Sequence, residues 1–134
     1  MAARKMTEIK VTVKNQVGEL ARVLGLATQA GVNIIAFCGY GRAGGGMGGE
    51  ILVVPDKPDK MEAALQKEHI SFESNPVVAI TGAAGKGMGA QMAGKFAKAA
   101  INILHSYAST TGSGNSTTIF RVEKPDVALK VLKT

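Results

Sequence analysis

The chain repeats itself, and this repeat constrains the fold more than any other feature of the sequence. The tetrapeptide Gly31-Val32-Asn33-Ile34 returns 69 positions later as Ala100-Ile101-Asn102-Ile103. Lys57-Pro58-Asp59 returns 67 positions later as Lys124-Pro125-Asp126, so one loop is two residues shorter in the second copy. Such length changes are typical of loops. Two related units of about 65–70 residues are therefore predicted, and a function is expected from what both copies share or from the groove between them.

Composition indicates a soluble globular protein. The 134 residues are 46% hydrophobic and 19% charged, which is enough to bury an ordinary core. The sequence has no long uncharged apolar run and no signal-peptide pattern, which argues against a membrane span or secretion. Cys38 is the single cysteine, so no internal disulfide can form, as is typical of a reducing compartment. We expect a cytoplasmic location.

The net charge of +6 raises the question of nucleic-acid binding, because clustered basic residues bind phosphates. The basic residues are scattered along this chain, and no aromatic residues interleave with them as platforms for stacking bases. The pattern favours a solvated surface over a nucleic-acid interface.

Each copy has the order strand, helix, strand, strand, helix. Ile9, Val11 and Val13 alternate with polar residues, which predicts a strand at 8–14. The other elements expected are helices at 17–30, from 58, 88–100 and 125–133, and strands at 32–40, 50–54, 69–74, 77–81, 101–109 and 117–123. This order predicts an α+β fold of two ferredoxin-like βαββα(β) units, with antiparallel sheets and both helices on one face.

Asn75-Pro76 is interpreted as the boundary between the copies, which gives one domain at residues 1–76 and another at 77–134. The second copy lacks the final strand, so its sheet edge is open unless another segment covers it, and an open edge favours oligomerisation. On the sheet face away from the helices we expect four apolar residues, which predict that a second copy or another subunit covers that face: Ile35, Phe37, Leu52 and Val54.

A glycine-rich string at 81–90 resembles nucleotide-binding motifs but does not satisfy them. Gly85, Gly87 and Ala90 fit G-x-G-x-x-A, yet the next strand ends without the acidic residue that a dinucleotide site needs. The string also fails as a Walker loop, because the spacing from Gly82 to Gly85-Lys86 is shorter than that motif requires. The string aligns instead with 15–20, and both stretches precede a helix. Glycine there lets a small anion or zwitterion approach free backbone amides, or simply lets the helix pack closely on the sheet.

The first copy resembles the ACT domain family. Its stretch Asn15-x-Val17-Gly18-x-Leu20, followed by Gly31-Val32-Asn33-Ile34, is similar to the family pattern nearly throughout. The second copy matches at Gly87 and at Ile101-Asn102-Ile103, but it has Ala84, Lys86 and Gly89 at the other motif positions. The resemblance spans both copies and implies a tandem ACT protein.

The resemblance implies regulation: a protein that binds an amino acid or other small molecule at a domain interface and signals to a metabolic enzyme. By position the ligand contacts in the first copy are Asn15, Gln16, Val17, Gly18, Glu19, Asn33 and Ile34. Those of the second copy are Gly85, Lys86, Gly87, Met88, Asn102 and Ile103. Because the second copy departs from the family motif, two alternatives stay open for it: it binds a different chemical group, such as a phosphate, or it binds no ligand. Asn33 and Asn102 either contact the ligand or only form hydrogen bonds within their own turns.

No catalytic or metal site is expected, and no cofactor. His69 and His105 have no Ser or Cys at a recognised spacing, and His105 is expected on the helix-facing side of its strand with Ile103 and Tyr107. Cys38 is expected on the corresponding face of the first copy, as a small core residue. The alternatives to an amino-acid sensor are a PII-like protein that binds nucleotide or phosphate, and a purely structural oligomerisation module. We expect a homo-oligomer.

Overall fold

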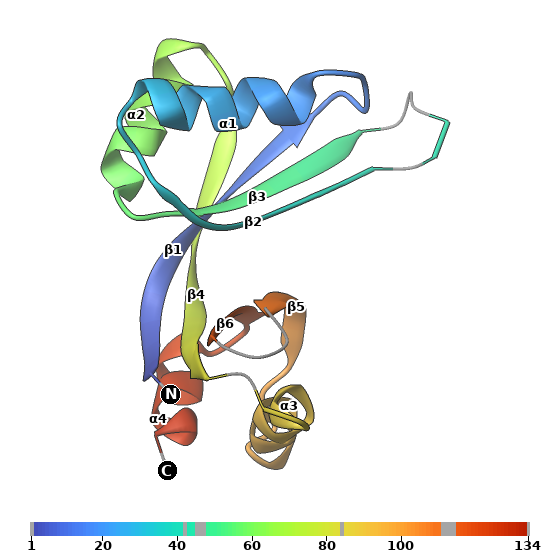
Figure 1. The fold of residues 1–134 in the computed structure, drawn as a ribbon, viewed down its shortest axis with the longest axis vertical. Coiled ribbons are helices and arrows are strands. Elements are labelled where there is room, and N and C mark those ends of the chain that lie inside the picture. Colours follow the sequence, from blue (N-terminus) through green and yellow to red (C-terminus); the bar gives the residue numbers. More distant parts are fainter. Residues whose placement is uncertain (1, 42, 45–47, 84, 111–114, 134) are drawn as a thin grey trace. The chain divides into compact units, whose positions relative to one another are not determined.

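A computed structural model describes residues 2–41, 43–44, 48–83, 85–110 and 115–133. The predicted loops at 41–49 and 110–116, and Ala84, lie wholly or partly outside the described residues. The chain divides into two compact units: the first unit consists of residues 7–75, and the second of residues 1–6 and 76–134. Both units have the predicted α+β architecture, with antiparallel strands and two helices on one sheet face (Figure 1).

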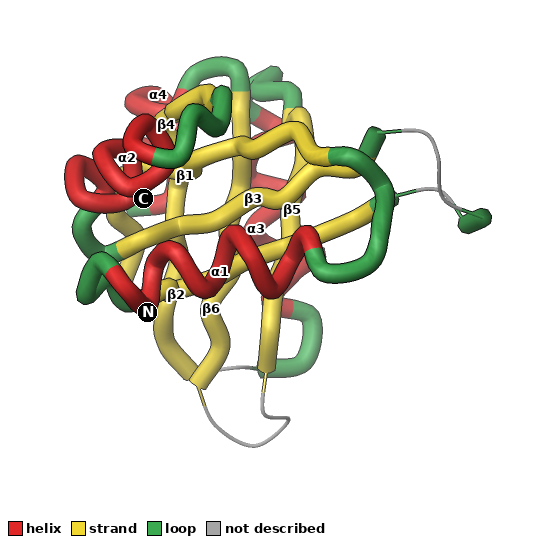
Figure 2. Tube along the Cα trace, turned by 90° about the horizontal axis from the view of Figure 1, so that it is seen from above, coloured by secondary structure: helices red, strands yellow, loops and turns green. Residues whose placement is uncertain are grey.

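The first unit contains β1 (Ala2–Val13, from residue 7), α1 (Glu19–Gln29), β2 (Ile34–Tyr40), β3 (Gly49–Pro55), α2 (Pro58–Lys67) and the start of β4 (Phe72–Ala83). Its hydrogen-bonded strand order is β2-β3-β1-β4, with β2 at the edge. Helix α1 runs along β2 and β3 (Figure 2). The alternation predicted for β1 is confirmed, because Ile9 and Val11 are fully buried on the helix side.

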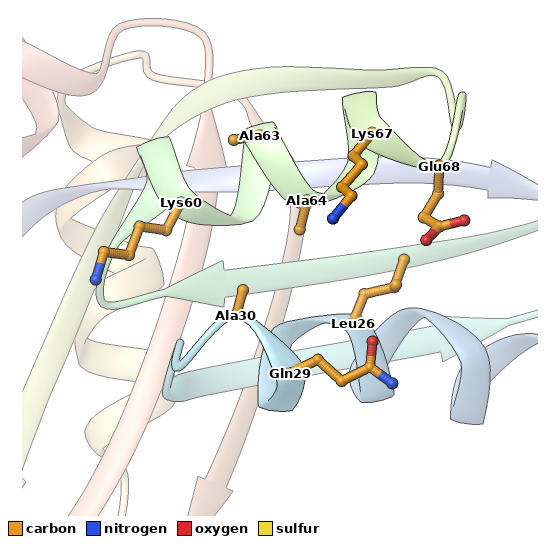
Figure 3. Close-up of a pocket in the computed structure, with 8 residues that line it drawn as sticks. All are labelled: Leu26, Gln29, Ala30, Lys60, Ala63, Ala64, Lys67 and Glu68. Atoms are coloured by element: carbon orange, nitrogen blue, oxygen red, sulfur yellow. The ribbon is translucent and has the colours of Figure 1, made fainter.

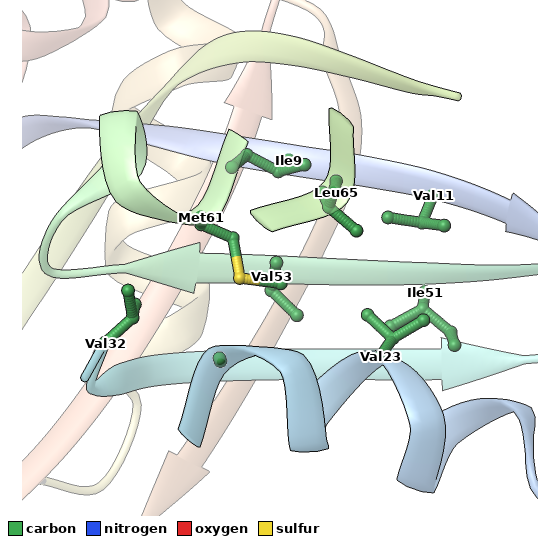
Figure 4. Packing of buried hydrophobic residues seen from close by; sticks show 9 residues of the cluster. Ile9, Val11, Val23, Val32, Ile51, Val53, Met61 and Leu65 are labelled. Carbon is green, nitrogen blue, oxygen red and sulfur yellow. The ribbon is translucent and has the colours of Figure 1, made fainter. Parts of the chain in front are cut away.

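The helices and the sheet of the first unit enclose one apolar core. Val23 of α1 meets Met61 and Leu65 of α2 over β1 and β3 (Figure 4), and Ala27 of α1 belongs to the same buried cluster. These helix residues recur at spacings of four, so each helix buries one stripe of side chains. Burial of each Val, Leu or Met side chain contributes about 1.5–3 kcal/mol to the stability of the fold.

The second unit repeats this plan with the rest of β4, then α3 (Met88–Lys98), β5 (Ile103–Thr110), β6 (Asn115–Val122) and α4 (Pro125–Leu132). Its strand order is β1-β4-β6-β5, so β5 is the edge. Phe96 of α3 packs edge-to-face on Phe120 of β6, with ring centroids 5.1 Å apart and planes at 81°. Ala128 and Leu132 of α4 complete the core and occupy the positions of Met61 and Leu65 in the first copy.

The strand that the second copy lacks has a counterpart at the start of the chain. Residues 2–6 of β1 belong to the second unit, and β1 is the hydrogen-bonded neighbour of β4. Ala3 packs against the second core, and Lys5 forms an ion pair of 3.0 Å with Asp126 at the start of α4. The two strands predicted at 69–74 and 77–81 are one continuous strand, β4, and the division between the units falls between Asn75 and Pro76. Each unit therefore contains four strands.

Two β-bulges reverse the predicted faces of β2 and β5. The register shifts between Ile34 and Ala36, so Phe37 pairs with Val53 on the helix side and Cys38 pairs with Leu52 on the opposite side. A second shift between Ile103 and His105 pairs His105 with Arg121. Directly paired residues share a face, and one extra residue moves every later side chain to the other face. The predictions for Phe37, Cys38, His105 and Tyr107 were therefore wrong.

Two of the four apolar residues expected on the face away from the helices are buried, and both belong to β3. Leu52 is 2% exposed and Val54 is 0% exposed, although neither belongs to the core under the helices. Ile35 is half-buried, and Phe37, at the sheet edge, is 51% exposed. Within the described residues, no helix is long and apolar enough to cross a membrane.

The repeat supplies a matched pair of positions for a stability test. Gly31 and Ala100 both follow a helix end with a positive φ, of 72° and 56°. The same hydrogen bond closes both turns, from Val32 N to Ala27 O and from Ile101 N to Phe96 O, each 2.9 Å. Because a Cβ disfavours this conformation, Ala100→Gly is expected to stabilise the chain by about 0.5–1 kcal/mol in urea unfolding, and Gly31→Ala to destabilise it similarly. A loss of stability in Ala100→Gly would contradict the assignment of strain.

Candidate ligand-binding site

The first helix begins at a glycine, which has no side chain to cap the helix. Gly18 is the N-cap of α1 with φ of 92°, and no side chain caps the helix. The first intrahelical bond there runs from Arg22 N to Gly18 O, at 2.9 Å. The amides of the first turn therefore lack intrahelical acceptors, and the helix dipole makes this end positive. A Cβ on Gly18 would meet nothing within 4 Å, so the space beside the turn is open.

A small cavity, here called the corner pocket, lies beside this helix start. It has a volume of about 140 Å³ and is lined by Val13, Lys14, Asn15, Gln16, Glu19, Leu20, Gly39, Tyr40, Gly49, Glu50 and Ile51. The turn before α1 and the facing ends of β2 and β3 contribute these residues. Leu20 closes the contact, since its Cδ1 would lie 3.5 Å from a Cβ on Gly39. Small-molecule pockets of drug size hold about 300–1,000 Å³, so the corner pocket fits a small molecule only.

Glu19 organises the polar side of the corner pocket. Its Oε2 accepts hydrogen bonds from Arg22 Nε at 2.9 Å and from the Arg22 terminal nitrogen at 2.6 Å. Its Oε1 accepts from Gln16 Nε2 at 3.0 Å. The hydrogen bonds and charge of Arg22 hold the pKa of Glu19 below its ordinary value, so the carboxylate is charged at neutral pH. The cluster leaves the Gln16 amide oxygen and the Glu19 carboxylate as acceptors beside the helix start.

Two further contacts shape the pocket. The Tyr40 hydroxyl donates to Glu50 Oε2 at 2.8 Å across the β2–β3 pair, and this bond is the main cause that raises the pKa of Tyr40 to about 12. The Asn15 side chain lies against Gly41, where an added Cβ would come within 2.8 Å of Asn15 Oδ1. The turn before α1 is therefore packed against the chain that leaves β2. Val17 is fully exposed.

Asn33 and Ile34 lie at the opposite end of β2 from this pocket. Asn33 N donates to Asp56 Oδ1 and Asn33 O accepts from Asp56 N, both at 2.9 Å. Since Ile34 and Tyr40 bound β2, the two groups of predicted contacts are separated by roughly 20 Å of strand. The first unit therefore brings together Asn15, Gln16 and Glu19 but leaves Asn33 and Ile34 apart from them.

The second unit has the same backbone at α3 and different side chains. Gly87 caps α3 with φ of 82° and no side-chain cap, and Met88 N donates to Gly85 O at 3.2 Å. Lys86 is exposed in the turn, and Met88 packs on the second core. Asn102 is tied to Glu123, whose backbone N donates to Asn102 O at 3.2 Å and whose carboxylate accepts from Asn102 Nδ2 at 3.4 Å. Ile103 is partly buried beside that core.

A family model described as an ACT domain pair matches residues 4–134. The chain belongs to this family. No curated protein sequence matches this ACT pair. Solved structures of other proteins share its fold. The crystal structure of protein BT0572 from Bacteroides thetaiotaomicron has a TM-score of 0.84 at 22% identity, over 98% of this chain and 88% of that one. The ligand-free regulatory subunit of aspartate kinase from Thermus thermophilus has a TM-score of 0.67 at 15% identity, over 99% and 95%. Aspartate kinase from Clostridium acetobutylicum has a TM-score of 0.65 at 18% identity, over 98% of this chain and 32% of that one.

The two corners of this ACT pair differ in chemistry. Residues 16, 19 and 22 of the first copy are Gln, Glu and Arg, and the positions 69 residues later carry Gly85, Met88 and Gln91. Tyr40 and Glu50 correspond to Ser109 and Ile119. The first corner thus combines free amides with acceptors, whereas the second offers the amides and Lys86. Among the described residues, no three His, Cys, Asp or Glu side chains gather as metal ligands.

Proposed function

We propose that this ACT pair is a regulatory protein that binds an amino acid in the corner pocket of the first unit and signals to a metabolic enzyme. The observation that carries the proposal is the uncapped start of α1 beside a small cavity that has polar side chains along one side. A carboxylate is stabilised at helix amides, and an ammonium needs acceptors, which the Gln16 amide oxygen, Glu19 and Glu50 provide. The volume of about 140 Å³ favours a small zwitterion over a nucleotide.

A second copy of the chain would complete the site. β2 is an edge strand of the first unit and carries Phe37 and Tyr40, which are 51% and 56% exposed. Exposed apolar edges favour pairing with another strand. If two β2 strands pair antiparallel about a two-fold axis, the Tyr40 end of one lies beside the Ile34 end of the other. The turn at 15–19 of one copy then meets Asn33 and Ile34 of its partner.

This arrangement explains how binding becomes a signal. A ligand held between two copies binds the paired state more tightly, so it shifts the population toward that state. A metabolic enzyme as the recipient is supported by the fold of the aspartate kinase regulatory subunit.

Thermal unfolding with each of the twenty amino acids at millimolar concentration tests the proposal. A ligand present at 100 times its Kd stabilises the native state by about 2.7 kcal/mol, so one or a few amino acids should raise Tm by several degrees. Sedimentation velocity on the same samples should show a ligand-dependent gain of dimer.

ATP, ADP and inorganic phosphate are the other arms of this experiment. Stabilisation by a nucleotide that Lys86→Ala abolishes would replace the amino-acid sensor with the PII-like alternative. If none of these compounds raises Tm, the result would favour the alternative that the protein is a purely structural oligomerisation module.

A further inference from the structure

The two helices of the first unit are separated by a groove that the ligand site does not use. Two cavities of about 330 and 320 Å³ lie along it, and they share Leu26, Gln29 and Glu68. Figure 3 shows Ala30 and Leu26 on the α1 side facing Ala64 on α2, with Lys67 and Glu68 at one end of α2 and Lys60 at the other. We call this surface the helix groove.

The helix groove has an apolar floor and a basic rim. Leu26, Ala30, Ala63 and Ala64 provide apolar surface, and Leu26 and Ala64 are only half-buried. The rim carries Lys60 and Lys67 against the single acid Glu68 of the lining, and Arg22, which lines the adjoining cavity, is paired with Glu19. Lys60, Lys67 and Glu68 form no side-chain hydrogen bond or ion pair within the described residues. The groove therefore presents unpaired ammonium groups around a hydrophobic strip.

The dimensions of the groove fit a helix better than a compact molecule. Its lining runs from Ala21 to Ala30, which is about 13 Å along α1 and nearly the length of that helix. Small residues such as Gly25 and Ala64 allow another backbone to approach closely, and a long apolar groove with charged rims is the usual receptor for an amphipathic helix.

The second unit lacks these features at the equivalent helix pair. Leu26 and Gln29 correspond to Lys95 and Lys98, and Ala63 and Ala64 correspond to Lys130 and Val131. Ala30 and Ala64 keep apolar counterparts in Ala99 and Val131, so the repeat has kept the helices but has lysines at two of the four positions of the apolar floor. This difference makes the second unit an internal control, because it has comparable positive charge but lysines interrupt its hydrophobic strip.

We propose that the helix groove binds an amphipathic helix of a partner protein, with an apolar stripe on Leu26 and the alanines and acidic residues opposite Lys60 and Lys67. The choice of an acidic partner follows from the charge of the rim, where like charges would repel and opposite charges pair. The inference needs no small-molecule ligand, so its test is independent of the amino-acid proposal.

Two synthetic peptides of about 15 residues, with the same leucine stripe and either Glu or Lys flanks, test the groove by fluorescence anisotropy against the full chain at about 0.15 M salt. We expect the acidic peptide to bind with micromolar Kd and the basic peptide not to bind. Lys60→Glu with Lys67→Glu should weaken binding by about tenfold or more, and so should Leu26→Lys, which introduces the residue found at position 95. Lys95→Glu with Lys98→Glu, an equal change of net charge in the second unit, should alter Kd by less than about twofold.

Four outcomes would overturn the proposal. These are absence of binding, equal binding of both peptides, equal weakening by the second-unit control, or conversion of a wild-type dimer to monomer by Leu26→Lys. The third would indicate attraction by net charge alone, and the last would show that the groove is filled by a second copy. Circular dichroism and Tm of Leu26→Lys report whether that variant folds, and the charge-reversal pair on exposed side chains gives an independent reading.

Discussion

Deleting residues 2–5 is expected to destabilise the second unit by roughly 2–4 kcal/mol. The deletion removes most of the segment of β1 that belongs to this unit, including Ala3 on its core and Lys5 beside Asp126. Each backbone hydrogen bond contributes about 0.5–1.5 kcal/mol, so the loss of even three bonds along β4 accounts for this range. Such a loss is a large part of the total stability of about 5–15 kcal/mol typical of a domain.

Hydrogen exchange with peptide resolution is the measurement that localises this effect. Amides of β4, β6 and α3 should exchange faster, while those of α1 and α2 change less. Lys5→Ala is the control, since an exposed ion pair contributes only about 0–1 kcal/mol. If the deleted chain kept wild-type protection in β6 and α3, residues 2–5 would not be a structural part of the second unit.

Replacing Gly18 with leucine is expected to abolish the amino-acid response while leaving the chain folded. The substitution places a side chain beside the first amides of α1, where a carboxylate is proposed to bind, and we expect affinity to fall by at least about tenfold. The side chain itself has room, because a Cβ at this position meets nothing within 4 Å. The remaining cost is the positive φ of 92°, about 1–2 kcal/mol.

Gly31→Leu separates loss of binding from this strain. Gly31 also has a positive φ, of 72°, and equally open space, but it lies at the other end of α1. Both variants should lose similar stability, and only Gly18→Leu should lose the ligand-induced rise in Tm. Equal ligand responses in the two variants would remove the start of α1 from the binding site.

Local patterns were sufficient to predict most of the architecture. The alternation of Ile9, Val11 and Val13 indicates the second half of β1, which the structure extends back to Ala2. The helices predicted at 17–30 and 88–100 agree with α1 and α3 to within about two residues at each end. The family resemblance is confirmed by the match over residues 4–134. The neighbour of β4 could not be predicted in this way, because pairing between residues 2–6 and the second unit depends on contacts distant in sequence.

The side-chain positions near the site were less predictable. A bulge of one residue reverses the face of a strand, and no glycine or proline marks the shift between Ile34 and Ala36. Tyr40 and Glu50 were missed because their contact depends on the hairpin register, whereas the spacing of Glu19 and Arg22 on one helix could have indicated their ion pair. The contacts predicted at Asn15–Glu19, Asn33 and Ile34, and those of the second copy, stay predictions until a ligand is bound.

Because β1 and β4 each contribute to both units, the second unit is encoded by two separate stretches of the gene, which correspond to residues 1–6 and 76–134. At about 5–20 residues per second, a ribosome exposes residues 2–6 roughly 4–15 s before the end of β4 has been made. During that interval the segment Ala2–Met6 has no neighbour to pair with. Until β4 is complete, this short segment can pair with other strands. Chaperones and proteases therefore have most access to it early in translation.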